Sequence, residues 1–174
     1  MRKIYVIGTV HNMLPGKKKE LKSLLEDIDP DQILVEIVNK DLRNNRIRKY
    51  PKEMIFAYIW AIKNGKKVNG SDVPINIIRK GFSQKELKIV EKSLTKIASK
   101  YTWKELNKSK YIRKLEIFDD KIIDKKKHRL RQKKMLENIQ KNMIKDGTIL
   151  ILTGSGHLKF FEKKLKEAIF PFRH

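Results

Sequence analysis

The feature of this sequence that most constrains its fold is the alternation of short apolar runs with segments of helical apolar spacing. Strand-like apolar runs cover residues 3–7, 32–37 and 148–153, and a less apolar one covers residues 66–72. Apolar residues at helical spacing fill the intervals between these runs. Strands that alternate with helices are typical of α/β proteins. We therefore expect a mostly parallel central sheet with flanking helices.

A helical insertion is expected ahead of the last strand. Ser83 with Glu86, and Thr102 with Glu105, match the capping-box pattern that begins helices. From about residue 82 to residue 127 the sequence shows helical patterns and basic loops, without the alternation typical of a strand. The sequence contains no repeat and no long linker, so we expect residues 1–174 to form a single domain.

Two histidines occupy the same setting at opposite ends of the chain. His11 follows the first apolar run and His157 follows the last, and each completes a G-x-x-H pattern that begins at Gly8 or Gly154. In an open parallel sheet, ligands bind beyond the carboxyl ends of the strands. Glu36 interrupts the second apolar run near its end, where a carboxylate is costly unless it is paired or exposed. We expect His11, Glu36 and His157 to converge at one edge of the sheet.

Three glycines near these histidines, Gly8, Gly154 and Gly156, are candidate cofactor-binding positions. Glycine allows a tight turn and a close approach of the backbone to a bound group. The stretch Gly154-Ser155-Gly156 precedes a predicted helix, so its backbone N–H groups could hold an anion. The chain has neither a P-loop lysine-serine pair nor a full dinucleotide fingerprint, so the indication of a nucleotide ligand is weak.

Arg131 is a further candidate site residue. It lies four residues before Met135, on the apolar stripe of a helix that we expect to end at Asp146-Gly147. That helix would span roughly 24 Å from Arg131 at ~1.5 Å per residue. The strand after it spans only about 20 Å. Arg131 should therefore overhang the carboxyl edge, where a buried guanidinium needs an anionic partner such as Glu36.

The absence of cysteine narrows the chemistry. It excludes disulfides, thiolate metal sites and a cysteine nucleophile, so any metal would be held by His, Asp or Glu. The longest apolar run is far shorter than the ~20 residues that a membrane-spanning helix needs. The N-terminus lacks the small-residue cleavage site of a signal peptide. We therefore expect no transmembrane segment and a cytoplasmic location.

The net charge of +22 raises the question of an acidic partner such as nucleic acid. Lysine dominates the excess and occurs on nearly every predicted helix, which is also what a general compositional bias would produce. The densest basic cluster covers residues 124–134, and His128 within it has no setting comparable to that of His11 or His157. We expect weak, non-specific nucleic-acid binding through Lys and Arg at most, and the sequence is compatible with a homo-oligomer.

Five stretches of the chain together resemble a known family. They are "IGTVHN", "PDQILVEI", "GSDVPINIIRKG", "RQKKM" and "LTGSGHLKFF". They are similar to the TraB/PrgY pheromone-shutdown family and to its wider relatives, the TIKI-type metalloproteases, the erythromycin esterase-like proteins and the ChaN-like proteins. The resemblance implies a hydrolase scaffold, among relatives that cleave peptides with a metal, hydrolyse esters or bind haem.

Carried over by position, the resemblance places the family's histidines on His11 and His157, its glutamate on Glu36 and its arginine on Arg131. Asp72 and Pro74 match the family's Asp-Arg-Pro segment, but Val73 stands where arginine is usual.

The function that we expect is a metal-dependent hydrolase, with a peptidase among the candidates, acting on a small molecule or a peptide. His11, Glu36 and His157 would hold a divalent cation such as Mn²⁺, Co²⁺, Zn²⁺ or Fe²⁺. Arg131 would stabilise developing negative charge. A second version needs no metal, because Glu36 or a histidine would act as a general base on water. The alternative is a non-catalytic, basic regulatory or nucleic-acid-associated binding protein on the same scaffold.

Overall fold

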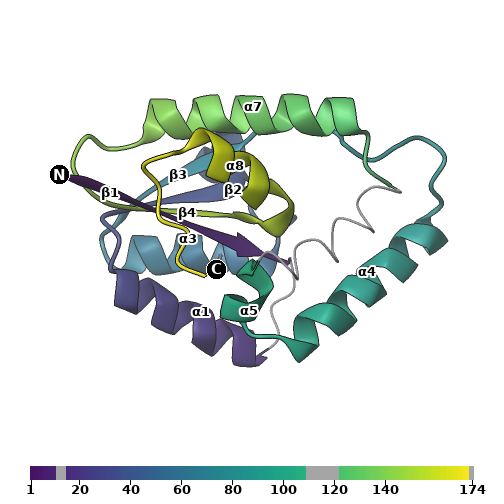
Figure 1. The fold of residues 1–174 in the computed structure, drawn as a ribbon, viewed down its shortest axis with the longest axis horizontal. Coiled ribbons are helices and arrows are strands. Elements are labelled where there is room, and N and C mark those ends of the chain that lie inside the picture. Colours follow the sequence, from purple (N-terminus) through teal and green to yellow (C-terminus); the bar gives the residue numbers. More distant parts are fainter. Residues whose placement is uncertain (11–14, 109–121, 173–174) are drawn as a thin grey trace.

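The computed structural model (Figure 1) describes residues 1–10, 15–108 and 122–172. Its centre is a four-stranded, all-parallel sheet with the strand order β1-β4-β2-β3. The strands are β1 (Arg2–Thr9), β2 (Gln32–Val38), β3 (Lys67–Asp72) and β4 (Gly147–Gly154). Helices flank the sheet, so the predicted α/β class with a mostly parallel sheet is confirmed.

Helices cover both faces of the sheet. On one side lie α1 (Pro15–Ile28), α3 (Lys52–Lys63) and α5 (Trp103–Asn107), and on the other lie α7 (Lys125–Asn142) and α8 (Leu158–Lys164). The short α2 (Asn39–Arg43) follows β2, and the 3-10 turn η1 (Ser155–His157) follows β4. The helix α4 (Gln84–Lys100) stands apart from both layers in Figure 1.

The continuous apolar runs exist because each strand buries both of its faces. In β4, Leu150 and Leu152 pack on the side of α1 and α3, whereas Ile149 and Ile151 pack on the side of α7 and α8. Successive side chains of a strand point to opposite faces, so a sheet covered on both sides needs apolar residues at every position. The sheet therefore has an apolar core on each of its faces.

The register aligns the carboxyl ends of three strands. Thr9 of β1 pairs with Gly154 of β4, and Val35 of β2 pairs with Leu152 of β4. Glu36 therefore lies level with Thr153. This carboxyl edge is where the sequence predicted a site.

The described part of the predicted insertion, residues 82–127, contains α4, α5 and the beginning of α7, and none of it joins the sheet. Residues 109–121 of this segment lie outside the described residues. Both predicted capping boxes are present, at Ser83 with Glu86 and at Thr102 with Glu105. However, α5 is more than a cover, because Trp103 is buried in the core on the α1 side.

The helix α7 ends at Asn142, so its predicted end at Asp146-Gly147 is wrong. The buried side chain of Gln32 binds the chain where the helix stops. Its Nε2 donates to the Asn142 carbonyl oxygen (2.8 Å), and its Oε1 accepts from the Ile144 N–H (2.9 Å). Because Gln32 of β2 satisfies these two backbone groups, the helix can end before Gly147. Arg131 nevertheless reaches the carboxyl edge, as its contacts there show.

Candidate functional site

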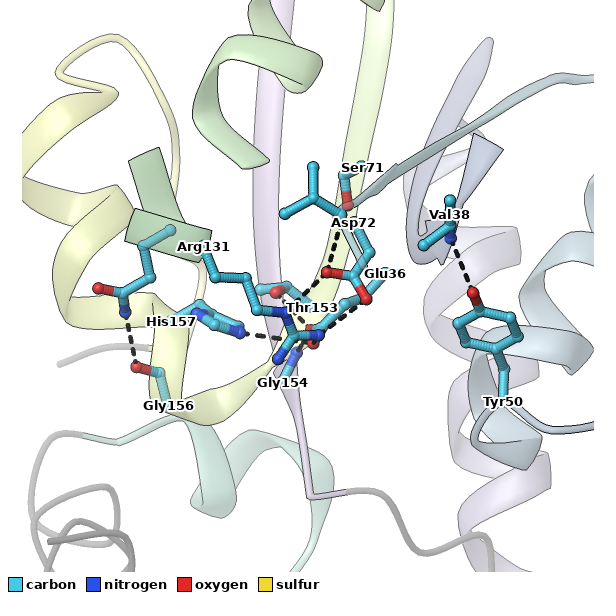
Figure 2. A network of polar contacts seen from close by, with 12 residues as sticks. Glu36, Val38, Tyr50, Ser71, Asp72, Arg131, Thr153, Gly154, Gly156 and His157 are labelled. Carbon is cyan, nitrogen blue, oxygen red and sulfur yellow. Dashed lines mark hydrogen bonds and ion pairs between the residues drawn. The ribbon is translucent and has the colours of Figure 1, made fainter. Parts of the chain in front are cut away.

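Glu36 is the centre of a polar cluster at the carboxyl edge of the sheet (Figure 2). Its side chain is only 5% exposed. Its Oε2 accepts hydrogen bonds from the Thr153 hydroxyl (2.8 Å) and from the Gly154 N–H, both on the neighbouring strand β4. Glu36 therefore interrupts its apolar run because β4 supplies donors for a buried carboxylate.

Arg131 extends from α7 to two carboxylates. Its Nη2 donates to Glu36 Oε1 (3.0 Å), which confirms the predicted pairing of these two residues. Its fork also binds Asp72 at the end of β3, with Nε to Oδ1 and Nη2 to Oδ2 both at 2.8 Å. Such bidentate pairs are strong and fix the guanidinium plane. Among the described residues, the remaining nitrogen, Nη1, makes no hydrogen bond.

Burial of Arg131 opposes its charge, but its carboxylate partners reverse that effect. Burial alone would lower the pKa of the guanidinium, whereas the hydrogen bond to Asp72 and the charge of Glu36 raise it above its usual value. Arg131 therefore stays protonated at any physiological pH. Asp72 was missed as a site residue by chemical reasoning on the sequence. The signal was available, since Asp72 ends a predicted strand just as Glu36 does.

His157 follows β4 and lies against Glu36. Its Nε2 is 3.4 Å from Glu36 Oε1, and its side chain is almost fully buried. Its Nδ1 is buried and has no hydrogen-bond partner among the described residues. A buried polar atom without a partner is uncommon and requires an explanation such as a ligand or a water molecule. Two of the predicted site residues, Glu36 and His157, thus meet as expected.

His128 was not predicted to belong to the site, but the structure places it there. Its ring lies 5.0 Å from that of His157, centre to centre, in an edge-on arrangement. Burial lowers the His128 pKa to about 4, and the nearby His157 and Arg131 contribute to the shift. The imidazole is therefore neutral at pH 7. The i, i+3 spacing of His128 and Arg131 on one helix was the signal that could have identified it.

His11, the other predicted histidine, lies outside the described residues, so its part in the cluster stays a prediction. Nearby, the Thr9 hydroxyl donates to Oε1 of Glu53 (3.1 Å), a fully buried carboxylate in the first turn of α3. Glu53 could not be recognised from the sequence, because a glutamate in the first turn of a helix is common.

The three candidate cofactor-binding glycines each have a structural partner. The N–H and carbonyl of Gly8 both bond to the Asn107 side chain (2.7 and 2.9 Å). The anion that the Gly154 N–H binds is the protein's own Glu36, and the Gly156 carbonyl accepts from Gln132 (3.4 Å). These contacts occupy backbone groups of all three glycines, and cofactor binding by them stays a prediction.

The cluster opens into a cavity of about 190 Å³. Its polar lining includes Thr9, Glu36, His128, Arg131 and His157. Apolar side chains of Ile77, Leu94 and Ile123 form other parts of the wall. Charged groups in a partly apolar cavity are typical of binding and catalytic sites.

A divalent metal fits the described residues poorly. Glu36 Oε1 is engaged by Arg131 and His157, and Oε2 is engaged by Thr153 and Gly154, so neither oxygen is readily available as a ligand. Within residues 1–10, 15–108 and 122–172, no three histidines or carboxylates are arranged to hold a metal ion. Metal binding therefore stays a prediction that depends on a ligand beyond these residues.

Comparison of the chain with protein-family models finds no match, and comparisons with curated proteins and with solved structures find none either. The resemblance to the TraB/PrgY family therefore rests on the five sequence stretches alone. In the described part of the chain, every helix is too short or too polar to cross a membrane.

Proposed function

We propose that this chain is a hydrolase of esters or amides, with His157, Glu36 and Arg131 as its working residues. The observation that supports this most strongly is the buried cluster of Glu36, Asp72, Arg131 and His157 beside a cavity. Buried ion pairs add little to stability, because desolvation offsets their attraction. Ionisable groups gathered in a cleft are more often explained by chemistry.

His157 is the proposed general base. When its Nε2–H points to Glu36, its Nδ1 carries a lone pair that can take a proton from water, and because Nδ1 is buried, the ring or the cavity wall must shift to admit that water. Glu36 holds the ring in that orientation. The water oxygen then bonds to the substrate's carbonyl carbon, the C–O or C–N bond breaks, and the leaving group receives the proton from His157. The products are a carboxylic acid and an alcohol or amine.

Arg131 is the proposed donor to the substrate's carbonyl oxygen. Asp72 and Glu36 engage Nε and Nη2, which leaves Nη1 as the donor for a ligand in the cavity that Arg131 lines. A guanidinium that is already oriented needs no rearrangement as negative charge develops on that oxygen.

The test is hydrolysis of a panel of esters, amides and peptides by the purified protein. His157→Ala should lower kcat by about 10²–10⁴-fold if this residue is the general base. The matched control is Lys133→Ala on the exposed side of α7, which should keep wild-type rates. Equal rates in the wild type and a folded His157→Ala variant would contradict the proposal.

The metal-dependent version of the proposal is tested separately. A bound Mn²⁺, Co²⁺, Zn²⁺ or Fe²⁺ would supply an acidified water, and it requires ligands beyond those described. Elemental analysis of the purified wild type and of His157→Ala distinguishes the two versions. Stoichiometric metal that is lost in the variant would support the metal-dependent version, and full activity after chelation would support the metal-free one.

A further inference from the structure

A second cavity, of about 340 Å³, adjoins the polar cluster. Glu36, Arg131, Ile77 and Ile123 line both this cavity and the smaller one beside His157. The rest of its wall is mostly apolar and consists of Tyr50, Pro51, Asp72, Ile78 and Ile122. The polar cavity beside His157 is therefore continuous with a second cavity whose wall is mostly apolar.

The isoleucine wall is held in place by backbone pairing outside the main sheet. Ile78 and Ile123 form an isolated antiparallel bridge. The Arg79 N–H donates to the Ile122 carbonyl (2.9 Å), and the Asp124 N–H donates to the Ile77 carbonyl (2.7 Å). This pairing joins the two segments that border the helical insertion, and it presents four isoleucines together.

These isoleucines are not taken up by the protein's own core. In the described part of the chain, none of the four belongs to either core cluster, and Ile78 is 40% exposed. Ile78 is exposed and the other three are half-buried at the cavity, and such a group of apolar side chains indicates a binding surface more than isolated ones do. The wall is thus available to a ligand.

Tyr50 forms a fixed, uncharged part of the same wall. Its hydroxyl donates to Asp41 Oδ2 (2.6 Å) and accepts from the Val38 N–H (3.3 Å), so two partners hold the hydroxyl end of the side chain. Figure 2 shows the contact with Val38. Burial, together with the hydrogen bond to Asp41, raises the Tyr50 pKa to about 12. The ring therefore stays neutral beside an apolar ligand.

We propose that this second cavity is the subsite for an aliphatic group of the substrate, which makes the substrates esters or amides of medium-chain aliphatic acids. The inference rests on the proposed hydrolase function. The shared wall of Glu36 and Arg131 places the carbonyl of such a molecule at the polar end and its chain among the isoleucines. The carboxylates of Glu36 and Asp72 would repel a negatively charged acyl chain, so the chain that fits this cavity is neutral.

Binding can be measured without catalysis. We would titrate the His157→Ala variant, which lacks the proposed general base and so should not hydrolyse amides, with hexanamide and with acetamide, and follow both by ligand-observed NMR. Each buried methylene strengthens binding by roughly fourfold, so hexanamide should bind at least about tenfold more tightly than acetamide. Equal binding of the two amides would overturn the proposal.

Two matched variants locate the subsite. Ile78→Asn should weaken hexanamide binding about tenfold, because it places an amide in the apolar wall. Ile59→Asn is the control, since Ile59 has nearly the same exposure (42% against 40%) and lies on α3. In the same His157→Ala background, it should leave binding within about twofold of that of His157→Ala alone. Equal effects of the two variants would overturn the proposal. Ile123→Ala is a second variant that should also weaken hexanamide binding about tenfold, and thermal unfolding would check that it is folded.

Hydrolysis then separates this inference from the function on which it rests. Hexanoyl esters that are cleaved with at least about tenfold higher kcat/KM than acetyl esters would support both. Selective hexanamide binding without hydrolysis of any ester or amide would retain the aliphatic site and refute the hydrolase. Hydrolysis without any preference for chain length, together with equal amide binding, would refute the subsite and retain the hydrolase.

Discussion

At the scale of single residues, the site depends on how Arg131 is shared between two carboxylates. Asp72 holds Nε and Nη2, and Glu36 takes the same Nη2 from the other side. The sequence predicted the contact with Glu36 from the reach of the helix. It could not rank Asp72 above it, because which strand end lies nearer to α7 is decided by the strand order.

Arg131→Lys should impair activity clearly although it keeps the positive charge. A lysine ammonium lacks the planar fork, so it cannot bind Asp72 at two points and still present a donor to the substrate. We expect kcat to fall about 10²–10³-fold, as for the loss of one oriented donor. Lys133→Ala, on an exposed position of the same helix, should have nearly wild-type kinetics. Equal rates in both variants would remove Arg131 from the site.

Tyr50 should make stability sensitive to alkaline pH. Its folded pKa, about 12, is raised above the ordinary value of 10.0, so its contribution is complete below pH 10 and is lost as the pH rises through 12. We expect about 1 kcal/mol after allowance for solvent screening. Urea unfolding at pH 9 and pH 11.5 measures the effect, and Tyr50→Phe is the control that should lack it. If Tyr50→Phe loses as much stability between pH 9 and pH 11.5 as the wild type does, the effect does not come from Tyr50.

At the scale of elements, the sequence predicted where helices begin more reliably than where they end. The two capping boxes are correct because each involves residues three apart. The end of α7 was misplaced because Gln32, more than a hundred residues away, binds the chain at Asn142 and Ile144. The spacing of His128 and Arg131 on α7 was a local signal for His128, but its contact with His157 comes from another element. Periodicity and spacing describe one element at a time and cannot show such contacts.

The short helix α5 should be important for stability through Asn107. This side chain bonds to both backbone groups of Gly8 and to the Trp103 carbonyl. Asn107→Ala leaves buried backbone groups without partners, which costs about 1–3 kcal/mol each. We expect a loss of about 2–5 kcal/mol in the free energy of unfolding, measured by urea denaturation. Asn64→Ala, whose bond to the Trp60 carbonyl is exposed, should cost under about 0.5 kcal/mol.

At the scale of the whole molecule, a strongly basic surface surrounds a site rich in carboxylates. The chain carries a net charge of +22, yet Glu36, Asp72 and Glu53 are all buried at or near the carboxyl edge. The exposed side of α7 carries Lys126, Arg129, Lys133 and others. Charge and site are therefore separate features of the molecule, and the charge gives no information about the reaction.

Binding to nucleic acid should be weak and strongly dependent on salt. Scattered Lys and Arg side chains neutralise phosphates without contacting base edges, so affinity follows the release of counterions. Fluorescence anisotropy with several unrelated duplexes should give similar affinities at 50 mM salt and little binding at 200 mM. If the protein still binds one duplex more tightly than the others at 200 mM salt, that result would favour the alternative of a nucleic-acid-associated protein.

The burial of Trp103 provides an optical probe of the joint between the insertion and the sheet. This residue is 2% exposed, and its indole donates to the Lys17 carbonyl (3.2 Å). The chain has only two tryptophans, so Trp60→Phe would leave Trp103 as the single strong fluorophore. Because Trp103 lies one helical turn before Asn107, a red shift of its emission would report that α5 had detached from β1 and released Gly8. Stopped-flow fluorescence could then time the opening of this joint relative to substrate binding and product release.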